Sequence, residues 1–362
     1  MEDKYKINDD RTIKVLLKKS FSGYKKKDVI DAVLKSIEKK KIENACYWTT
    51  ECIVSGYTLT LWEKLIIFSS KIIHINNPKL PFYLYCKGEI LANQVNRLKK
   101  DEQLLIRNSQ MIRNLFFDVI STLSTSLKTK RYDNLPKIDE KEDFDFQNIQ
   151  KRLFSTMNIL PDHIIHFNDP DELRIICNEF YTLLKNKQFG YEKCCYWILW
   201  IQKWESMHKK NKTVLNINHR KIEGVSKKYT DNIIWIFWEL IMIEVDVQKN
   251  TMISKQINSL YSLFKNGFTN SKRNSRLPIV FNAIGYLTHN ISFNSPLRDN
   301  YHIFIQVQSN VNKMFHLQKQ NEKKNTNNHI QSTPPIKENL KHEIVNDKIS
   351  LFNQIDIAIS KK

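Results

Sequence analysis

Two histidines three positions apart, His163 and His166, are the first residues in this chain whose types and spacing could do chemistry. Asp162 and Asp169 lie beside them and could complete a metal site. Zinc needs three or four ligands that converge on one point. The stretch has the pattern of a loop before a helix cap, which favours structural or solvated histidines. We therefore predict no metal and no other cofactor.

The cysteines offer a second kind of chemistry. Cys194 and Cys195 are adjacent, and either could be a nucleophile if His208 or His219 lay beside it in the fold. Both lie in an apolar, aromatic stretch, where burial raises the pKa of a thiol and makes it inert. We interpret both as core residues. The six cysteines show no C-x-x-C spacing and no regular framework, which indicates a reducing, intracellular compartment.

Enzyme motifs are not visible in the sequence. There is no G-x-x-x-x-G-K-[ST] phosphate loop and no paired-acid metal-binding motif. Glutamates at positions 51, 63, 205 and 239 lie in aromatic stretches and could do acid–base work if they were partly buried. Beside so many lysines they more often form ion pairs. The sequence favours a non-catalytic protein, and an enzyme whose site is assembled from distant residues stays open.

Positive charge is the strongest functional signal. The 362 residues carry a formal net charge of +19. The segment from Leu317 onward has 8 Lys and 5 acidic residues, so about +16 belongs to the part before it. A field of this size favours polyanions as partners: nucleic acid first, then acidic protein or anionic lipid. The alternative is the base composition of an AT-rich genome, because Lys, Asn and Ile are all abundant.

Four groups of lysine and arginine fall between predicted helices, in segments from which long side chains reach phosphates easily. Tyr24, Tyr132 and Phe268 lie near these groups and could stack on bases. The predicted nucleic-acid-binding residues are Lys25, Lys26 and Lys27 in GYKKKD, Lys128, Lys130 and Arg131 in KTKR, Lys209 and Lys210 in HKKNK, and Lys272, Arg273 and Arg276 in SKRNSR.

SKRNSR, residues 271–276, is the most specific of the four groups. Arg273 and Arg276 precede a predicted helix that is led by Pro278. A helix N-terminus flanked by two arginines suits an anion. The same residues also fit a solvated turn, so both interpretations stay open.

The elements that position these residues are predicted to be helices. Only 7 glycines occur in the chain, too few for a many-stranded fold or for glycine-rich loops. Hydrophobic residues make up 41% of the chain and recur at helical spacing. The polar stretch 213–228 is predicted to be a short hairpin or a loop. Helices are predicted as a pair within 28–56 and then at 59–75, 82–98, 102–126, 148–158, 169–187, 191–210, 229–247, 250–268, 277–289 and 296–318.

The fold class is predicted to be all-α, with two related multi-helix halves and a disordered C-terminal tail. An acidic stretch without apolar periodicity marks a linker between the halves. The tail is low in complexity, although residues 350–359 could form a short terminal helix. The predicted organisation is a first half at 1–130, the linker at 131–147, a second half at 148–317 and the tail at 318–362.

An aromatic motif occurs once in each predicted half. E-x-[AC]-C-Y-W appears at 43–48 and again at 192–197, and a Trp-Glu pair follows each copy. A tandem duplication explains both coincidences with one event, and chance in an aromatic-rich chain is the alternative. Large rings at such positions are typical of core anchors where helices cross. The predicted anchors are Tyr47, Trp48, Trp62, Tyr196, Trp197 and Trp238.

The first copy resembles a known helical element. The stretch ACYWTTECIVSGYTLTLWEKLIIFSSKIIHINNP, residues 45–78, resembles the helical collar of replication-associated AAA+ ATPases related to clamp loaders. Those collars have an A-x-Y-W helix, then an apolar helix with Ser before a final Asn-Pro. The resemblance implies oligomerisation, or docking onto a replication or transcription complex, without the ATPase. The matching residues are Ala45, Tyr47, Trp48, Ser69, Ile72, Asn77 and Pro78.

The chain as a whole resembles uncharacterised helical proteins of giant (nucleocytoplasmic large) DNA viruses. The resemblance rests on the Lys, Asn and Ile bias, on the Tyr-Trp helices, and on YTDNIIWIFWEL and SRLPIVFNAIGYLT. It implies a structural or nucleic-acid-associated component of a virion or of a viral factory in the host cytoplasm. The expected partner is DNA or RNA, with other viral proteins or further copies of this chain as alternatives. No apolar run reaches 18 residues, so no membrane span is predicted.

Overall fold

The computed structural model describes residues 3–99, 102–129 and 135–323. Over these ranges the chain forms 14 α-helices, joined by turns and short 3-10 or π segments, without a β-strand. The predicted all-α class is therefore confirmed. Apolar residues at helical spacing and the scarcity of glycine account for this outcome.

Contacts between residues group the chain into two compact units. Unit 1 comprises the described residues of 1–65, 86–127 and 297–323. Unit 2 comprises 66–85 and the described residues of 128–296. The units differ from the predicted halves, because 66–85 group with the later part of the chain and 297–317 group with the earlier part. The tandem duplication stays a prediction.

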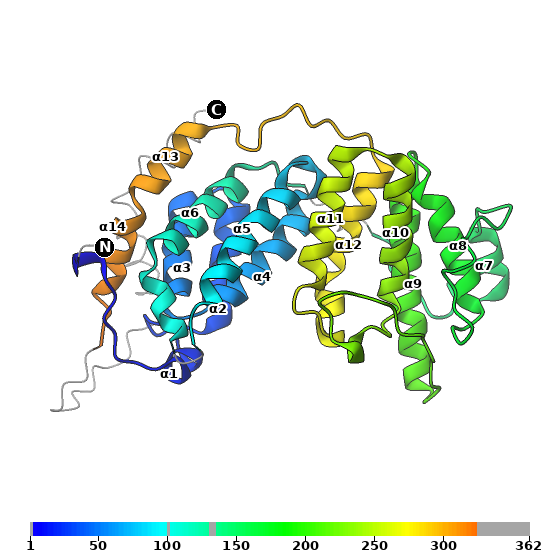
Figure 1. Ribbon diagram of the computed structural model, residues 1–362, viewed down its shortest axis with the longest axis horizontal. Helices are drawn as coiled ribbons and strands as arrows, with labels where there is room; N and C mark the ends of the chain where they lie inside the picture. The colour runs from blue at the N-terminus through cyan, green and yellow to red at the C-terminus, as the bar shows by residue number, and fades with distance from the viewer. Residues whose placement is uncertain (1–2, 100–101, 130–134, 324–362) are drawn as a thin grey trace. The chain divides into compact units, whose positions relative to one another are not determined.

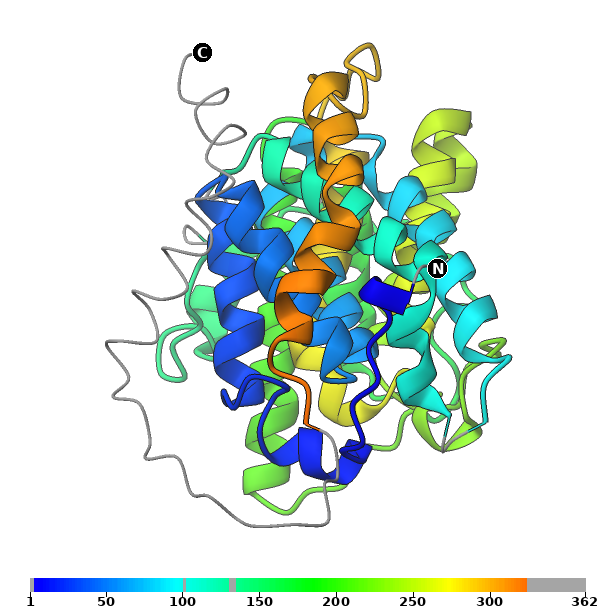
Figure 2. The same cartoon turned by 90° about the vertical axis from the view of Figure 1, so that its left-hand side faces the viewer.

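Unit 1 is organised around α3 (Ile42–Val54), which is buried along nearly its whole length. α2 (Lys26–Glu38) packs along α3, and α6 (Gln110–Thr125) packs on both. The buried stripe of α2 has the i, i+4, i+8 spacing of a helix face. Figure 2 shows α13 and α14 in orange beside the helices of this unit. The other helices of unit 1 are α1 (Ile13–Lys18), parts of α4 (Thr58–Phe68) and α5 (Leu80–Val95), α13 (Tyr301–Ser309) and α14 (Val311–Lys319).

A buried carboxylate fastens the N-terminal segment to unit 1. Glu51 of α3 accepts hydrogen bonds from the backbone N and the Oγ of Ser22, both at 2.7 Å. Ser22 Oγ also lies 3.1 Å from Oε1 of Gln318 in α14. Burial raises the pKa of Glu51 even though these hydrogen bonds act against the shift. Three distant parts of the chain therefore meet at one buried acid.

Unit 2 has α12 (Arg273–Thr288) at its centre. This helix is buried along most of its length and packs on α9 (Gly190–Lys210), α10 (Ile234–Gln248) and α11 (Thr251–Lys265). Figure 1 shows α10, α11 and α12 side by side. α8 (Glu172–Leu184) packs on α9 and α10, and the short α7 (Phe146–Arg152) precedes it.

The predicted core anchors all lie in the interior. Tyr47 and Trp48 of α3 meet edge to face with their ring centroids 5.4 Å apart. Tyr196 and Trp197 of α9 meet in the same way at 5.1 Å. Each pair lies on the second helix of a packed pair, α2–α3 or α8–α9. The exposed fractions are 5% for Tyr47, 7% for Trp48, Trp62 and Tyr196, and 1% for Trp197 and Trp238.

The predicted starts of α8 and α12 are wrong. α8 begins at Glu172 instead of Asp169, because the Asp169 side chain is engaged elsewhere. α12 begins at Arg273, so Pro278 lies inside the helix and does not lead it. Of the two alternatives predicted for 213–228, the structure has the loop, which ends in a short 3-10 turn.

The acidic stretch that was predicted as a linker packs against α9. Asp143 is buried, and its Oδ1 accepts a hydrogen bond from the Tyr196 hydroxyl at 3.0 Å. The carbonyl oxygen of Asp143 accepts from Trp200 Nε1 at 2.7 Å, and Phe144 stacks on Trp200 at 4.5 Å. Aromatic side chains of α9 thus hold residues 143–144, while 131–134 lie outside the described residues.

The first residues of the predicted tail are also ordered parts of unit 1. Gln318 is 1% exposed in α14. Glu322 Oε1 accepts from the backbone N of Asn8 at 2.8 Å, and the backbone N of Lys323 donates to Asp9 Oδ2 at 2.9 Å. The rest of the predicted tail, 324–362 with the terminal helix at 350–359, lies outside the described residues.

Candidate nucleic-acid interface

The first predicted basic group lies at the start of α2. Lys25 and Lys27 are exposed there. Lys26 is partly buried, and its Nζ donates a hydrogen bond to Thr60 Oγ1 at 2.9 Å. Of the second group, Lys128 is partly buried, and Lys130, Arg131 and the neighbouring Tyr132 lie outside the described residues.

The arginines of the fourth group do not form the predicted anion site. Arg276 is 5% exposed, and its Nη1 donates to the carbonyl oxygens of Phe264 and Asn266, the latter at 2.9 Å. Arg273 Nη1 pairs with Glu205, 2.8 Å from Oε1 and 2.6 Å from Oε2. Both guanidinium groups are thus bound by acceptors within unit 2. Lys272, the third member of the group, is partly exposed.

The described residues that were predicted to stack on bases pack against other aromatic rings of the protein. Tyr24 lies edge to face against Trp48 with a centroid distance of 5.3 Å. Phe268 is 4% exposed, and its ring centroid is 4.7 Å from that of Trp235. Phe268 is therefore a core residue, and the prediction that it stacks on a base is wrong. The reason is that its ring completes the aromatic core around α10 and α11.

Residues 208–228, called the basic segment below, concentrate positive charge in unit 2. The segment has seven Lys or Arg residues and one acidic residue. It starts at the C-terminal end of α9, where the predicted residues Lys209 and Lys210 are exposed. Of its seven basic residues only Arg220 is buried. The exposed ones are Lys209, Lys210, Lys212, Lys221, Lys227 and Lys228.

Asp169 holds the basic segment in place. Its side chain is 0% exposed. Oδ1 accepts from the backbone N of Asn218 at 2.8 Å, and Oδ2 accepts from the backbone N of His166 at 2.8 Å and from Arg220 Nη2. The backbone N of Arg220 donates to the carbonyl oxygen of Thr230 at 2.9 Å. The loop that carries the other four lysines, Lys212, Lys221, Lys227 and Lys228, therefore has a defined path near Arg220.

The start of the basic segment borders a cavity of about 480 Å³, called the α9 cavity. Lys209 and Arg273 both line it, so the structure brings together members of two groups that are distant in the sequence. Burial raises the pKa of Glu205, which also lines this cavity, while Arg273 acts to lower it. Because Glu205 offsets the charge of Arg273, Lys209 supplies the outward positive charge here.

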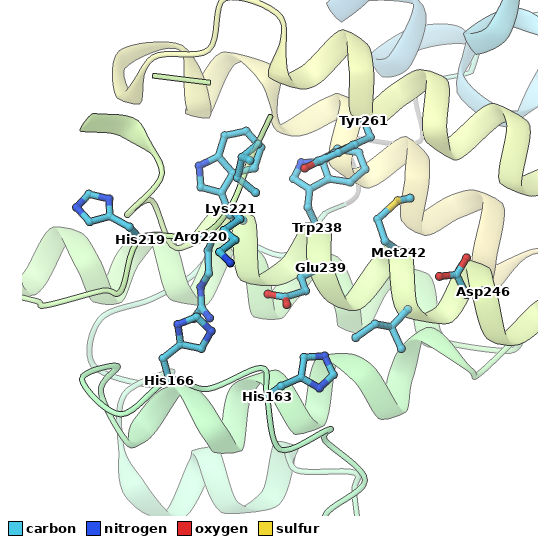
Figure 3. Close-up of a pocket in the computed structure, with 13 residues that line it drawn as sticks. His163, His166, His219, Arg220, Lys221, Trp238, Glu239, Met242, Asp246 and Tyr261 are labelled. Atoms are coloured by element: carbon cyan, nitrogen blue, oxygen red, sulfur yellow. The ribbon is translucent and has the colours of Figure 1, made fainter. Parts of the chain in front are cut away.

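The middle of the basic segment borders a larger cavity of about 520 Å³, called the α10 cavity. The loop before α8, the basic segment, α10 and α11 each contribute to its lining. Figure 3 shows the rings of Trp238 and Tyr261 on one side of this space and those of His163 and His166 on the other. The lining residues used below are His163, His166, Arg220, Lys221, Trp238, Glu239 and Tyr261.

Two residues that line the α10 cavity have buried N–H donors without an acceptor in the described part of the chain. Among the described residues, nothing accepts a hydrogen bond from Arg220 Nε, Arg220 Nη1 or Trp238 Nε1. The side chain of Arg220 is 4% exposed, and Trp238 is 1% exposed. A buried donor without a partner costs about 1–3 kcal/mol, so an acceptor at this point would be stabilising.

One carboxylate of the α10 cavity is also without a partner. Glu239 is partly exposed and forms no hydrogen bond or ion pair with any described residue. Burial, and then the nearby Glu239, raise the pKa of Tyr261, so the hydroxyl of Tyr261 keeps its proton at neutral pH. The cavity thus offers several donors to a ligand, and the carboxylates of Glu239 and Asp246 as strong acceptors.

Metal and thiol chemistry find no support in the described part of the chain. It contains no group of three or more His, Cys, Asp or Glu side chains that could hold a metal ion. His163 and His166 lie in a loop, as predicted, and line the α10 cavity. Cys194 and Cys195 are 0% exposed, and burial raises the pKa of both thiols, which confirms their prediction as core residues.

Comparison of the chain with protein-family models, with curated proteins and with solved structures finds no match. In the part of the chain that the structure describes, no helix has both the length and the apolar character needed to cross a membrane. The charge and geometry of unit 2 are therefore the basis for proposing a function.

Sequence reasoning missed most of this candidate site. It selected Lys209 and Lys210 but interpreted 213–228 as an inserted loop or hairpin. It assigned Asp169 to a helix cap, although this side chain bonds to Asn218 and Arg220 about 50 residues away. One signal could have revealed the site: the ratio of seven basic residues to one acid over 208–228 is far above that of the whole chain.

Proposed function

We propose that the protein binds nucleic acid through phosphate contacts of the basic segment, and that it works by binding and not by catalysis. The observation that carries the proposal is the set of six exposed lysines on one anchored segment. Contacts to phosphates position a protein on nucleic acid but carry no sequence information. The binding is therefore expected to show little sequence preference.

The anchoring of the segment matters as much as its charge. Each lysine that neutralises a phosphate releases condensed counterions, and this release drives binding at low salt. A loop that must first become ordered loses part of that gain. Because Asp169 and Thr230 already hold the backbone near Arg220, the segment does not need to find its path on binding.

The proposal is tested by titrating fluorescently labelled 20-nucleotide strands at several salt concentrations. Replacing Lys209, Lys210 and Lys212 by Ala should reduce the slope of log affinity against log salt by about two to three. A matched control replaces the three exposed lysines at 39–41 by Ala; they lie in the turn between α2 and α3. Both triplets contain one lysine with a positive φ, at Lys40 and Lys212, so the backbone change is comparable.

The two triple variants distinguish a local interface from a general effect of charge. The proposal expects the 39–41 variant to keep the slope of the unmodified protein. An equal reduction in both variants would contradict it, because net charge alone would then control the binding.

A second candidate function, docking onto a partner protein through unit 1, is favoured by one observation. A cavity of about 230 Å³ lies beside Gly56, Thr58 and Thr60, within the stretch that resembles a helical collar. Leu17 and Leu59 line it and are 50% and 51% exposed. Docking takes first place if no nucleic acid binds at low salt. The giant-virus setting belongs to both candidates and rests on the resemblance of the sequence.

A further inference from the structure

We propose that the α10 cavity takes one nucleotide of a single strand whose neighbouring phosphates lie on the basic segment, an inference that rests on the proposed function. Arg220 and Lys221 belong both to the basic segment and to the lining of the cavity. A strand that follows the segment therefore passes the mouth of the cavity. The volume of about 520 Å³ lies within the range of roughly 300–1,000 Å³ for small-ligand sites.

The phosphate end of this site is Arg220. Asp169 holds Nη2 of its guanidinium, and Nε and Nη1 have no acceptor among the described residues. A guanidinium forms charge-assisted hydrogen bonds with phosphate oxygens, and Nε and Nη1 each have an N–H left for such a bond. Lys221 is exposed next to it and adds a second positive charge. Because Asp169 offsets the charge of Arg220, this end of the cavity offers an anion the free N–H groups of Arg220 and the positive charge of Lys221.

The base end is formed by Glu239 and Tyr261. Figure 3 shows the Glu239 carboxylate in the space between Arg220 and His163, below the rings of Trp238 and Tyr261. A carboxylate accepts a hydrogen bond from the exocyclic amino group of a base and repels a carbonyl oxygen at the same position. The ring of Tyr261 is partly exposed and gives the base a flat apolar contact.

The cavity selects single strands, because the edge of a base reaches a pocket only when the base is unpaired. A duplex can contact the lysines of the basic segment, but its bases cannot enter the cavity. Unpaired cytosine carries an amino group where uracil carries a carbonyl oxygen, so these two bases differ at the position that Glu239 reads. The site should therefore prefer cytosine to uracil.

The test is calorimetric titration of the full chain with cytidine 5′-monophosphate, uridine 5′-monophosphate and inorganic phosphate. The cytidine nucleotide should bind roughly 5- to 150-fold more tightly than the uridine nucleotide, as expected for one good polar contact to a base. Inorganic phosphate should bind more weakly than either. Glu239→Gln should remove the difference, because an amide can both donate and accept. Glu223→Gln, the same change at an acid outside the cavity lining, should preserve it.

Equal binding of the two nucleotides would overturn the inference, as would no binding of either nucleotide by a protein that still binds strands. The proposed function would survive both results. If the nucleotides bind as expected but the lysine variants leave strand binding unchanged, the proposed role of the basic segment fails while the nucleotide site stands. Glu239 is partly exposed and without a partner, so Glu239→Gln should fold, and thermal melting checks this.

Discussion

Replacing Asp169 by alanine tests how the basic segment is held. The Asp169 side chain is 0% exposed and accepts hydrogen bonds from the backbone N of His166, from the backbone N of Asn218 and from Arg220. The variant leaves two backbone N–H groups and one guanidinium without their acceptor. It should therefore release both the loop before α8 and the middle of the basic segment.

The size of the effect follows from these contacts. Removing one partner of a buried ion pair costs about 3–5 kcal/mol, and each buried N–H left unpaired costs about 1–3 kcal/mol. The individual costs do not add, because release of the loop lets the Arg220 side chain move into the solvent, where water hydrates it. We expect the free energy of opening for 161–169 and 213–228 to fall by about 3–5 kcal/mol. The cores of both units should stay folded.

Hydrogen exchange measured by mass spectrometry reports this opening directly. Peptides that cover 161–169 and 213–228 should lose protection in Asp169→Ala, while peptides from α12 and from unit 1 should not. Asp171→Ala is the matched control, because Asp171 is exposed and its side chain forms no capping hydrogen bond with α8. The control should change stability by no more than about 0.5 kcal/mol. Unchanged protection of 213–228 in Asp169→Ala would refute the assignment of Asp169 as the anchor.

Two further predictions concern the cores. Trp197→Ala should lower the free energy of unfolding by about 3–5 kcal/mol in a denaturant titration. Phe167→Ala, which removes a fully exposed ring, should have almost no effect. A loss of under about 1 kcal/mol for Trp197→Ala would show that Trp197 is no core anchor. Burial raises the pKa of Glu51, so its contribution to stability is complete below the unfolded-state pKa and is lost as the pH rises through the folded-state pKa. In Glu51→Gln the melting temperature should therefore decline less steeply as the pH rises above the ordinary pKa range of carboxyl groups. An equal decline with pH in the variant and in the unmodified protein would contradict this.

Helical periodicity carried enough information to predict the fold class and most of the helices. The E-x-[AC]-C-Y-W motifs located Trp48 and Trp197 in the interior, because a large ring at such a position must be covered by a second helix. The acidic stretch near Asp143 was misjudged, since an acid that accepts from Tyr196 and Arg152 looks in the sequence like an acid in a linker.

The candidate site was harder to predict, because its parts meet only through contacts of high sequence separation. Arg276 looked like a phosphate ligand, yet its charge is used to bind carbonyl oxygens at the end of α11. Glu239 looked like an ion-pair partner on an aromatic helix, yet it has no partner among the described residues. The spacing of residues in the sequence does not distinguish a charged side chain that binds other groups of the protein from one that is available to a ligand.

The salt dependence of single-strand binding by the unmodified chain is the most direct measurement of nucleic-acid binding through the basic segment. Affinity should fall steeply between about 50 and 200 mM salt, with little difference among sequences outside the single position read by the α10 cavity. The slope should decrease by about two to three when Lys209, Lys210 and Lys212 are replaced by Ala, and it should not change in the 39–41 variant. No measurable binding of any strand at about 50 mM salt would contradict the proposal.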